Sequence, residues 1–246
     1  MLTIMSIALI LLLLYTIVPF IASRWVGIGV FQRSYRDERL ALTFDDGPDP
    51  VYTNELLDLL KENQVKASFF VVGERAQQYP DIIRRMYREG HLIGVHNYVH
   101  RSNWLMAPWQ VKQGVKKTAD IIEDITGSRP VYYRPPWGML NLFDLFLHKN
   151  FQIILWSVMV GDWRSKGGEK KIINRLREKI TPGATIVLHD CGVTKGADED
   201  APKYTIKALR QLFKEMPVKN YSFIRIDEML TRTNAQALEL EFDKLN

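Results

Sequence analysis

The chain has 246 residues, of which 46% are hydrophobic and 25% are charged, enough for one well-buried domain besides a membrane segment. Its formal charge of +5 is carried by scattered Lys and Arg residues rather than by a cluster, which argues against nucleic-acid binding. The single cysteine, Cys191, excludes an intramolecular disulfide and a cysteine-based zinc site.

The N-terminal stretch is apolar. Residues 1–23 contain no Lys, Arg, Asp or Glu, and Leu9–Leu14 is entirely aliphatic. A charge-free stretch of this length can span a bilayer. A cleavable signal peptide is the alternative, but no basic region precedes the apolar run and no small-x-small cleavage site follows it. We therefore predict an uncleaved membrane anchor, with Arg24 and Trp25 at the membrane interface.

The flanking charges predict a membrane orientation. Four arginines follow the predicted span within sixteen residues, whereas only the α-amino group precedes it. The positive-inside rule therefore places the large domain in the cytoplasm. Because long domains translocate despite such charges, a substrate outside the cell would predict the opposite orientation.

From Asp37 onward, short apolar runs alternate with amphipathic stretches of helical period. The predicted strands are Leu40–Phe44, Ala67–Val72, Leu92–Val95, Val131–Arg134, Gln152–Trp156, Thr185–Leu188 and Ser222–Ile226. The predicted helices are Asn54–Glu62, Arg75–Glu89, Val111–Thr126, Leu140–Lys149, Glu169–Ile180 and Pro202–Glu215. This α/β alternation favours a parallel sheet closed into an incomplete β/α barrel. We divide the chain into an anchor with the start of a linker (1–29), the linker (30–38), one domain (39–230) and a C-terminal tail or helix (231–246).

The first predicted strand ends on two adjacent carboxylates, Asp45 and Asp46, followed by a Gly-Pro turn. Neighbouring residues at a strand end point in different directions. One carboxylate can therefore hold a cation while the other accepts a proton. For this hexapeptide alone, a turn in which Asp caps backbone amides is an equally good interpretation.

The third predicted strand is followed by two imidazoles four residues apart, His96 and His100. That spacing puts both on one face of a helical turn, within reach of one metal ion, although two surface histidines would have the same pattern. In a parallel barrel this pair and the two carboxylates lie at the same rim. Two imidazoles and one carboxylate are typical of a catalytic metal site, with zinc the expected ion and cobalt, nickel or manganese as substitutes.

Three more motifs follow later strands: Arg134-Pro135-Pro136-Trp137-Gly138, Asp162-Trp163 and Leu188-His189-Asp190. Arg134 can orient a carboxylate, and Trp137 offers a flat face to a sugar ring. Taken singly, these motifs are as typical of a buried ion pair, a core Trp or a capping His. All five motifs together lie at the carboxyl ends of predicted strands, where β/α barrels have their active sites.

In this order, the five motifs resemble the polysaccharide deacetylase family, also called the NodB homology domain or carbohydrate esterase family four. The resemblance covers roughly residues 39–229 and implies a distorted (β/α)7 barrel that hydrolyses N-acetyl groups on aminosugar polymers with a divalent metal. Matching positions imply metal ligands at Asp46, His96 and His100. They also imply a general base at Asp45, oriented by Arg134, and a general acid at His189 with Asp162 behind it. The implied substrate-binding residues are Trp137, Trp163, Leu188 and Pro135.

Two positions depart from the family pattern. Asn97 stands where the family usually has Ser or Thr, and its amide is expected to keep the loop hydrogen-bonded so that metal binding survives. Met159 stands where many members carry an acid, which would alter the groove.

The resemblance favours peptidoglycan as the substrate, followed by chitin oligomers or poly-N-acetylglucosamine. An amide hydrolase of small molecules and a catalytically inactive glycan-binding protein are the alternatives. Since wall polymers lie outside the cell, the substrate predicts a single-pass membrane protein with an extracytoplasmic domain, against the arginine count.

Overall fold

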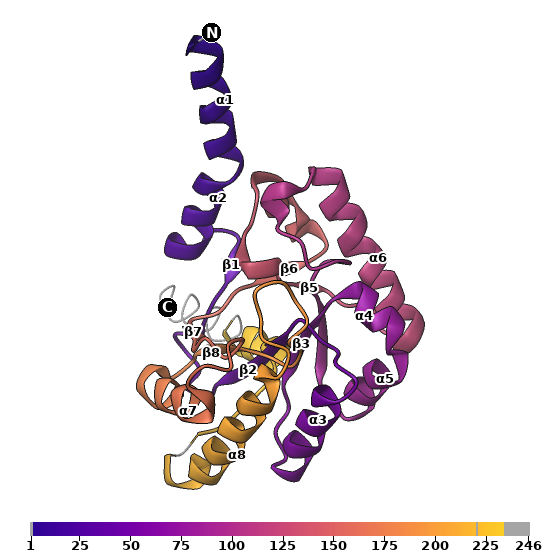
Figure 1. Ribbon diagram of the computed structural model, residues 1–246, viewed down its shortest axis with the longest axis vertical. Coiled ribbons are helices and arrows are strands. Elements are labelled where there is room, and N and C mark those ends of the chain that lie inside the picture. Colours follow the sequence, from indigo (N-terminus) through magenta and orange to yellow (C-terminus); the bar gives the residue numbers. More distant parts are fainter. Residues whose placement is uncertain (1, 220, 234–246) are drawn as a thin grey trace, which may run out of the picture.

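In the computed structural model, which describes residues 2–219 and 221–233, eight parallel strands form one sheet curled into a half-barrel (Figure 1). The strand order is β1-β6-β5-β4-β3-β2-β8-β7. The strands are β1 (Val30–Phe31), β2 (Ala41–Asp45), β3 (Ser68–Val71), β4 (Leu92–Val95), β5 (Tyr132–Tyr133), β6 (Gln152–Ile154), β7 (Val158–Met159) and β8 (Thr185–His189). Within the described residues no pairing joins β1 to β7, so the sheet stays open along one side.

Helices cover the outside of the sheet, and three short 3-10 helices lie in the loops. The α-helices of the domain are α3 (Tyr52–Glu62), α4 (Gly73–Gln78), α5 (Pro80–Arg88), α6 (Pro108–Thr126), α7 (Gly168–Lys179) and α8 (Ala201–Lys219). The 3-10 helices are η2 (Asn103–Leu105), η3 (Pro136–Gly138) and η4 (Leu142–Lys149). Apolar side chains from these helices form one large core with the strands, and every residue of β2 is buried. Strand β2, which ends at Asp45 and is followed by Asp46, is therefore buried and paired on both sides, with β3 and β8.

Six of the predicted strands are confirmed, and the seventh, Ser222–Ile226, is wrong. That segment contacts the sheet through a single bridge between Leu40 and Phe223, because the chain turns helical from residue 226. Residues 226–233 are helical, and of the predicted C-terminal tail or helix at 231–246 only 231–233 belong to the described residues. The strands β1 and β7 were not predicted, because two residues are too few to show an alternating pattern.

Two predicted helices differ in detail. The predicted helix Arg75–Glu89 is two helices, α4 and α5, because Pro80 cannot continue a helix and instead begins the second one. The predicted helix Leu140–Lys149 is the 3-10 helix η4.

The N-terminal stretch is helical and projects from the domain (Figure 1). It consists of α1 (Leu2–Tyr15), α2 (Ile17–Ile21) and a π-helical turn, η1 (Ala22–Val26). Thr3–Val26 is long and apolar enough to cross a membrane, a property that an N-terminal signal sequence shares. The side chains of residues 3–14 in α1 are exposed, Tyr15 is half-buried, and Thr16, Pro19 and Ser23 are buried.

A buried polar cluster ties η4 to the loop after β4. Asn103 donates from Nδ2 to Asp144 Oδ2 over 2.8 Å, and the Asn141 backbone N–H donates to the same oxygen over 2.8 Å. Tyr133 of β5 donates from its hydroxyl to Asn97 Oδ1 over 2.8 Å. The pKa of Asp144 is raised to about 7, because the effect of burial outweighs the hydrogen bonds from Asn103 and Asn141, which act to lower it. Asp144 is therefore neutral over part of the range in which an exposed Asp is charged.

We predict that Asp144 makes the fold less stable as pH rises. Between about pH 4 and pH 7 the folded chain holds a proton at Asp144 that the unfolded chain has released, so the free energy of unfolding falls across this range and then levels off. An Asp144→Asn variant keeps an oxygen acceptor but lacks this titration. Thermal unfolding followed by circular dichroism should show the variant gaining stability relative to the parent chain between pH 5 and pH 8. An unchanged difference between the two chains would contradict the raised pKa.

Candidate active site

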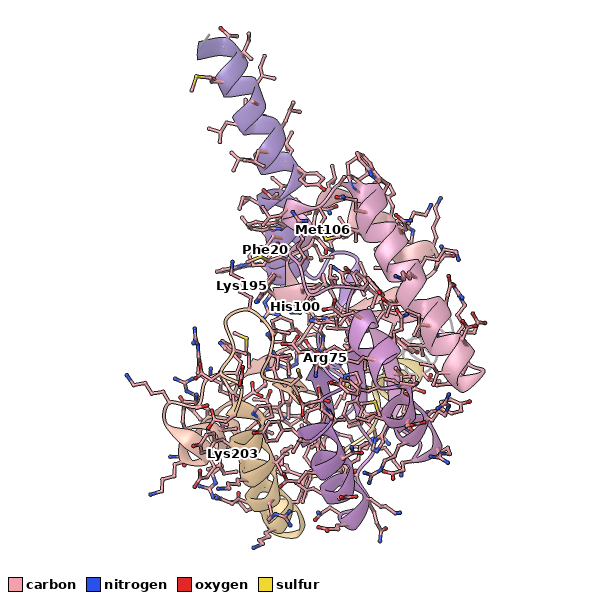
Figure 2. All side chains as sticks on the ribbon, turned by 45° about the vertical axis from the view of Figure 1, so that its right-hand side comes forward. Phe20, Arg75, His100, Met106, Lys195 and Lys203 are labelled. Carbon is pink, nitrogen blue, oxygen red and sulfur yellow. The ribbon has the colours of Figure 1, made fainter. Side chains whose placement is uncertain are left out.

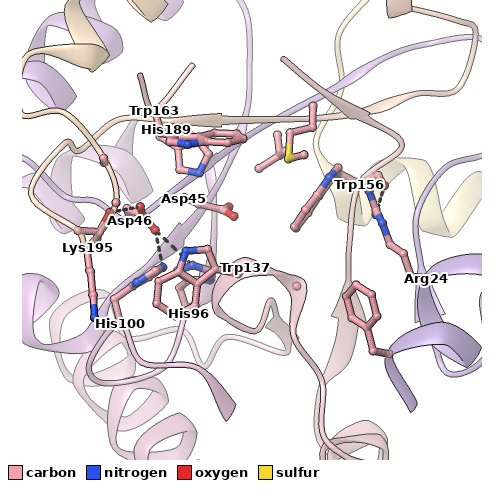
Figure 3. A pocket seen from close by; sticks show the side chains of 17 residues that line it. Arg24, Asp45, Asp46, His96, His100, Trp137, Trp156, Trp163, His189 and Lys195 are labelled. Carbon is pink, nitrogen blue, oxygen red and sulfur yellow. Dashed lines mark hydrogen bonds and ion pairs between the residues drawn. The ribbon is translucent and has the colours of Figure 1, made fainter. Parts of the chain in front are cut away.

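The candidate residues lie at or just after the carboxyl ends of the strands, and Figure 3 shows Asp45, Asp46, His96, His100 and His189 gathered in one pocket. Asp45, the last residue of β2, pairs in register with His189, the last residue of β8. His96 directly follows β4, and Arg134 directly follows β5. Residues from distant parts of the chain are therefore gathered by the parallel register rather than by proximity in sequence.

Asp46, His96 and His100 form a compact group. Asp46 Oδ1 lies 3.3 Å from His96 Nε2 and 3.1 Å from His100 Nε2. One ligand atom from each residue falls within 4.8 Å of the others. Burial alone would raise the pKa of Asp46, but the hydrogen bonds that it makes with His100 and His96 hold that pKa well below its usual range. The carboxylate is therefore ionised at neutral pH.

The hydrogen bonds around this group fit a metal ion. His96 Nδ1 lies 2.7 Å from the Arg134 carbonyl oxygen, so that nitrogen carries a proton and Nε2 is the nitrogen that faces Asp46. Asp46 Oδ1 is buried without a hydrogen-bond donor, whereas Oδ2 accepts a hydrogen bond from Thr194 Oγ1 over 2.6 Å. Electron pairs converging on one buried point repel one another unless a cation lies between them. This donor set is one that zinc and related ions bind.

The segment that carries the histidine pair is a loop, so the predicted helical turn is wrong. Asn97 has a left-handed backbone with φ 61°, which Asn tolerates better than most residues and which interrupts a helix. Backbone N–H groups at the start of α4 donate to the loop, from Gly73 to Asn97 O and from Glu74 to Tyr98 O, each over 2.9 Å. The Asn97 side chain also donates to Asn103 Oδ1 over 2.7 Å. The loop is thus held by hydrogen bonds to neighbouring segments instead of the internal backbone hydrogen bonds of a helix.

Asp45 is paired with a fully buried arginine. Arg134 Nη1 donates to Asp45 Oδ1 over 2.6 Å and to Thr43 Oγ1 over 2.8 Å. The other guanidinium nitrogens donate to the carbonyl oxygens of Ile154 and Leu155 over 3.1 Å each. Burial lowers the pKa of Arg134, and Asp45 opposes that shift. A buried charge with this many partners holds its carboxylate in one orientation.

His189 is held by a second carboxylate, Asp162. The ring Nδ1 lies 3.0 Å from Asp162 Oδ1, and the His189 backbone N–H donates to Asp162 Oδ2 over 2.7 Å. Thr205 donates to the same carboxylate over 3.1 Å. Burial lowers the pKa of His189, but Asp162 outweighs it and raises that pKa to about 10. The ring is therefore protonated at neutral pH, with Nε2 turned away from Asp162.

These groups share a pocket of about 440 Å3 with Trp137 and Trp163. Arg134 and Asp162 lie behind its lining, in contact with Asp45 and His189. Two residues that the resemblance implied for the pocket, Leu188 and Pro135, do not line it, and both are buried.

The alternation of side chains along β8 explains the position of Leu188. Val187 and His189 line the pocket, while Leu188 packs in the core with residues of the surrounding helices. This parity could have been seen in the sequence, since His189 was already a candidate.

One wall of the pocket comes from the N-terminal segment, which sequence reasoning did not connect with the site. Phe20 and Arg24 line the pocket, and Figure 3 shows Arg24 on the side opposite Asp46. Arg24 Nη1 donates to the Trp156 carbonyl oxygen over 2.7 Å, and the guanidinium lies 4.7 Å from the centre of the Trp156 ring. Phe20 packs edge-on against Trp104, with ring centres 5.7 Å apart. No local pattern indicates contacts over such separations along the chain.

Comparison with known sequences identifies relatives. A sequence model of one family, described as polysaccharide deacetylase, matches residues 32–143. The chain is 33% identical over 201 residues to a peptidoglycan-N-acetylglucosamine deacetylase of Bacillus cereus, covering 81% of this chain and 70% of the relative. It is 40% identical over 171 residues to the peptidoglycan-N-acetylmuramic acid deacetylase PdaC of Bacillus subtilis, covering 68% of this chain and 36% of PdaC.

A solved structure shares the fold. The Bc1960 peptidoglycan N-acetylglucosamine deacetylase superposes with a TM-score of 0.76 at 31% sequence identity. The superposition covers 84% of this chain and 95% of that structure.

We predict that the pKa of His189 depends on Asp162. Replacing Asp162 with Asn removes the negative charge that favours the charged ring, so the pKa of His189 should fall by about one to three units. NMR titration of the histidine rings in the metal-free chain measures this directly. His91, whose pKa burial lowers to about 4, lies outside the pocket lining and serves as an internal reference. An unchanged His189 titration in the variant would show that Asp162 does not control this ring.

Proposed function

The chain belongs to the polysaccharide deacetylase family, as the five motifs indicated, and we propose that it is a peptidoglycan N-deacetylase. It hydrolyses the N-acetyl group of an N-acetylglucosamine or N-acetylmuramic acid residue, which are the sugars named for its relatives. The observation that carries this proposal is the meeting of an Asp-His-His group, an arginine-paired carboxylate and a protonated imidazole in one pocket.

Asp46, His96 and His100 would hold one divalent ion, and we propose zinc, with cobalt, nickel or manganese as substitutes. When bound, such an ion polarises the acetamide carbonyl and lowers the pKa of a water molecule. The chain's own groups then have to remove a proton from that water and supply one to the departing amine.

Asp45 is the proposed general base. Its carboxylate lines the pocket beside Asp46, and its Oδ1 is held by Arg134, so the other oxygen can accept the proton of the attacking water. Arg134 lies behind the lining and acts as the positioning residue.

His189 is the proposed general acid. An amine is a poor leaving group as an anion, so its nitrogen must be protonated as the carbon–nitrogen bond breaks. With Nδ1 facing Asp162, His189 presents the proton on Nε2 to the pocket. Asp162 keeps the ring charged and fixes its orientation.

The pocket surface supports a sugar polymer as the substrate. Trp137 and Trp163 line the two sides of the reacting groups, next to His100 and His189 respectively, and offer flat apolar faces. Exposed Met159 lines the groove where many family members carry an acid, so this chain presents an apolar side chain there. Peptidoglycan is the proposed substrate, ahead of chitin oligomers and poly-N-acetylglucosamine.

We also propose that residues 1–29 anchor the chain in the cell membrane as a single-pass protein. Residues 30–38, the predicted linker, contribute β1 to the sheet and lead to the rest of the catalytic domain at 39–230, which faces outward because peptidoglycan lies outside the cell. The apolar helix and its packing against the pocket support this division.

The first test is removal of the metal ligands. Asp46→Ala and His100→Ala variants should lose bound metal and lose acetate release from purified peptidoglycan by about a hundredfold or more. His148→Ala, which removes an exposed histidine outside the pocket lining, should leave metal content and activity unchanged. Metal analysis and an acetate assay measure both effects, and a chelator should reproduce the loss. Normal acetate release from a metal-free chain would overturn the proposal.

The second test separates the base from the metal ligands. An Asp45→Asn variant should keep bound metal but lose acetate release by about a hundredfold to ten-thousandfold, since the amide cannot accept a proton. Retained metal also shows that the pocket of this variant is folded, although Arg134 no longer has a charged partner at position 45. Parental activity in this variant would exclude Asp45 as the base.

A further inference from the structure

The domain exposes large apolar side chains where η2 and η4 meet the base of the N-terminal helix. We call four of these side chains the apolar collar: Leu105, Trp109, Phe143 and Phe146. Their exposed fractions are 70%, 72%, 48% and 61%, respectively. They come from η2, the first turn of α6 and η4. Scattered exposed apolar residues are ordinary on a soluble protein, but a group of large ones at one place marks an interaction surface.

The apolar collar is continuous with the N-terminal helix. Tyr15, at the end of α1, donates from its hydroxyl to the Met106 carbonyl oxygen over 2.7 Å. The Tyr15 ring lies 6.2 Å from the ring of Phe143, which in turn lies 6.1 Å from Phe146. Figure 2 shows Phe20 and Met106 together at the base of the helix. One apolar surface therefore runs from the helix onto the domain.

The extent of the apolar helical stretch indicates what covers this surface. The stretch that is long enough to cross a membrane, Thr3–Val26, includes α2 as well as α1. At 1.5 Å per residue its 24 residues span about 36 Å, and the hydrocarbon core of a bilayer is about 30 Å thick. An anchor that crosses the hydrocarbon with this stretch therefore places α2 in the membrane or at its boundary. Because α2 packs against η4, the domain surface around it must enter the membrane as well.

We propose that the apolar collar is inserted into the bilayer surface, so that the domain rests on the membrane from which its anchor emerges. Its Trp and Phe side chains are of the kind that lie at membrane interfaces. The inference rests on the proposed anchor, because a cleaved leader would leave the collar without a membrane to meet.

Insertion of the apolar collar also determines where the catalytic pocket meets its substrate. Phe20 and Arg24 belong to the anchor segment and also line the catalytic pocket. With the collar inserted, the pocket opens beside the lipid surface. The glycan that reaches Asp45 and His189 is therefore one presented close to the membrane, rather than one in the outer layers of the wall.

Lipid contact can be measured in the full chain reconstituted into phosphatidylglycerol and phosphatidylethanolamine vesicles. Leu105→Cys and Phe146→Cys variants carry an environment-sensitive fluorophore, and lipids with a nitroxide near the headgroup quench it. Ile7→Cys on α1 reports insertion of the helix, and Tyr87→Cys on α5 is an exposed control on a side of the domain away from α1 (Figure 1). The native Cys191 is 1% exposed and stays unlabelled in the folded chain.

Labels at positions 105 and 146 should be quenched at least about threefold more than the label at position 87. Quenching no stronger than that at position 87 would overturn the collar, whether or not position 7 is quenched. A blue-shifted but unquenched label would show that a second copy of the chain covers this surface, and would equally reject lipid insertion.

Acetate release from soluble peptidoglycan fragments, measured on the same labelled chains, keeps the two proposals apart. An active chain without lipid quenching would reject the collar and leave the deacetylase function standing. A quenched chain without acetate release would do the reverse.

Discussion

One buried arginine connects the proposed general base with the Asp-His-His group. The Arg134 side chain holds Asp45, and its backbone carbonyl accepts the hydrogen bond that orients His96. Arg134 follows β5, while Asp45 ends β2, with β4 and β3 between them. In a flat sheet three strand spacings come to about 14 Å, farther than an arginine side chain extends. The curl of the sheet therefore brings the two side chains together, and within the described residues Asp45 is the one carboxylate paired with this buried charge.

The same constraint explains how two adjacent carboxylates acquire different roles. Asp45 ends a regular strand and faces the guanidinium, whereas Asp46 has a left-handed backbone, with φ 79°, that turns its side chain toward the imidazoles. Such a backbone is costly for a residue other than glycine, and it persists where the surroundings impose it. Environment, rather than residue type, thus separates a proton acceptor from a metal ligand one position away.

The sequence predicted the parts of this arrangement that are written locally. Strand ends, the histidine spacing and the two carboxylates are patterns within a few residues, and the parallel register then brings them together. Contacts made by Thr194 with Asp46, or by Arg24 with Trp156, depend on how loops far apart in the chain meet, and no local pattern encodes them. The short strands β1 and β7 could not be predicted either, because two residues show no alternating pattern. They are strands because they pair with β6 and β8.

The N-terminal segment shows what such long-range contacts decide. A signal sequence and an anchor have the same composition, so hydropathy alone does not separate them. Cleavage after Ser23 would remove Phe20, which is the aromatic partner of Trp104 and part of one wall of the pocket. It would also remove Thr16 and Pro19, which are buried against the domain. Removal of this segment would leave the catalytic pocket and the apolar surface beneath the helix incomplete. The packing therefore supports the retained anchor that we propose.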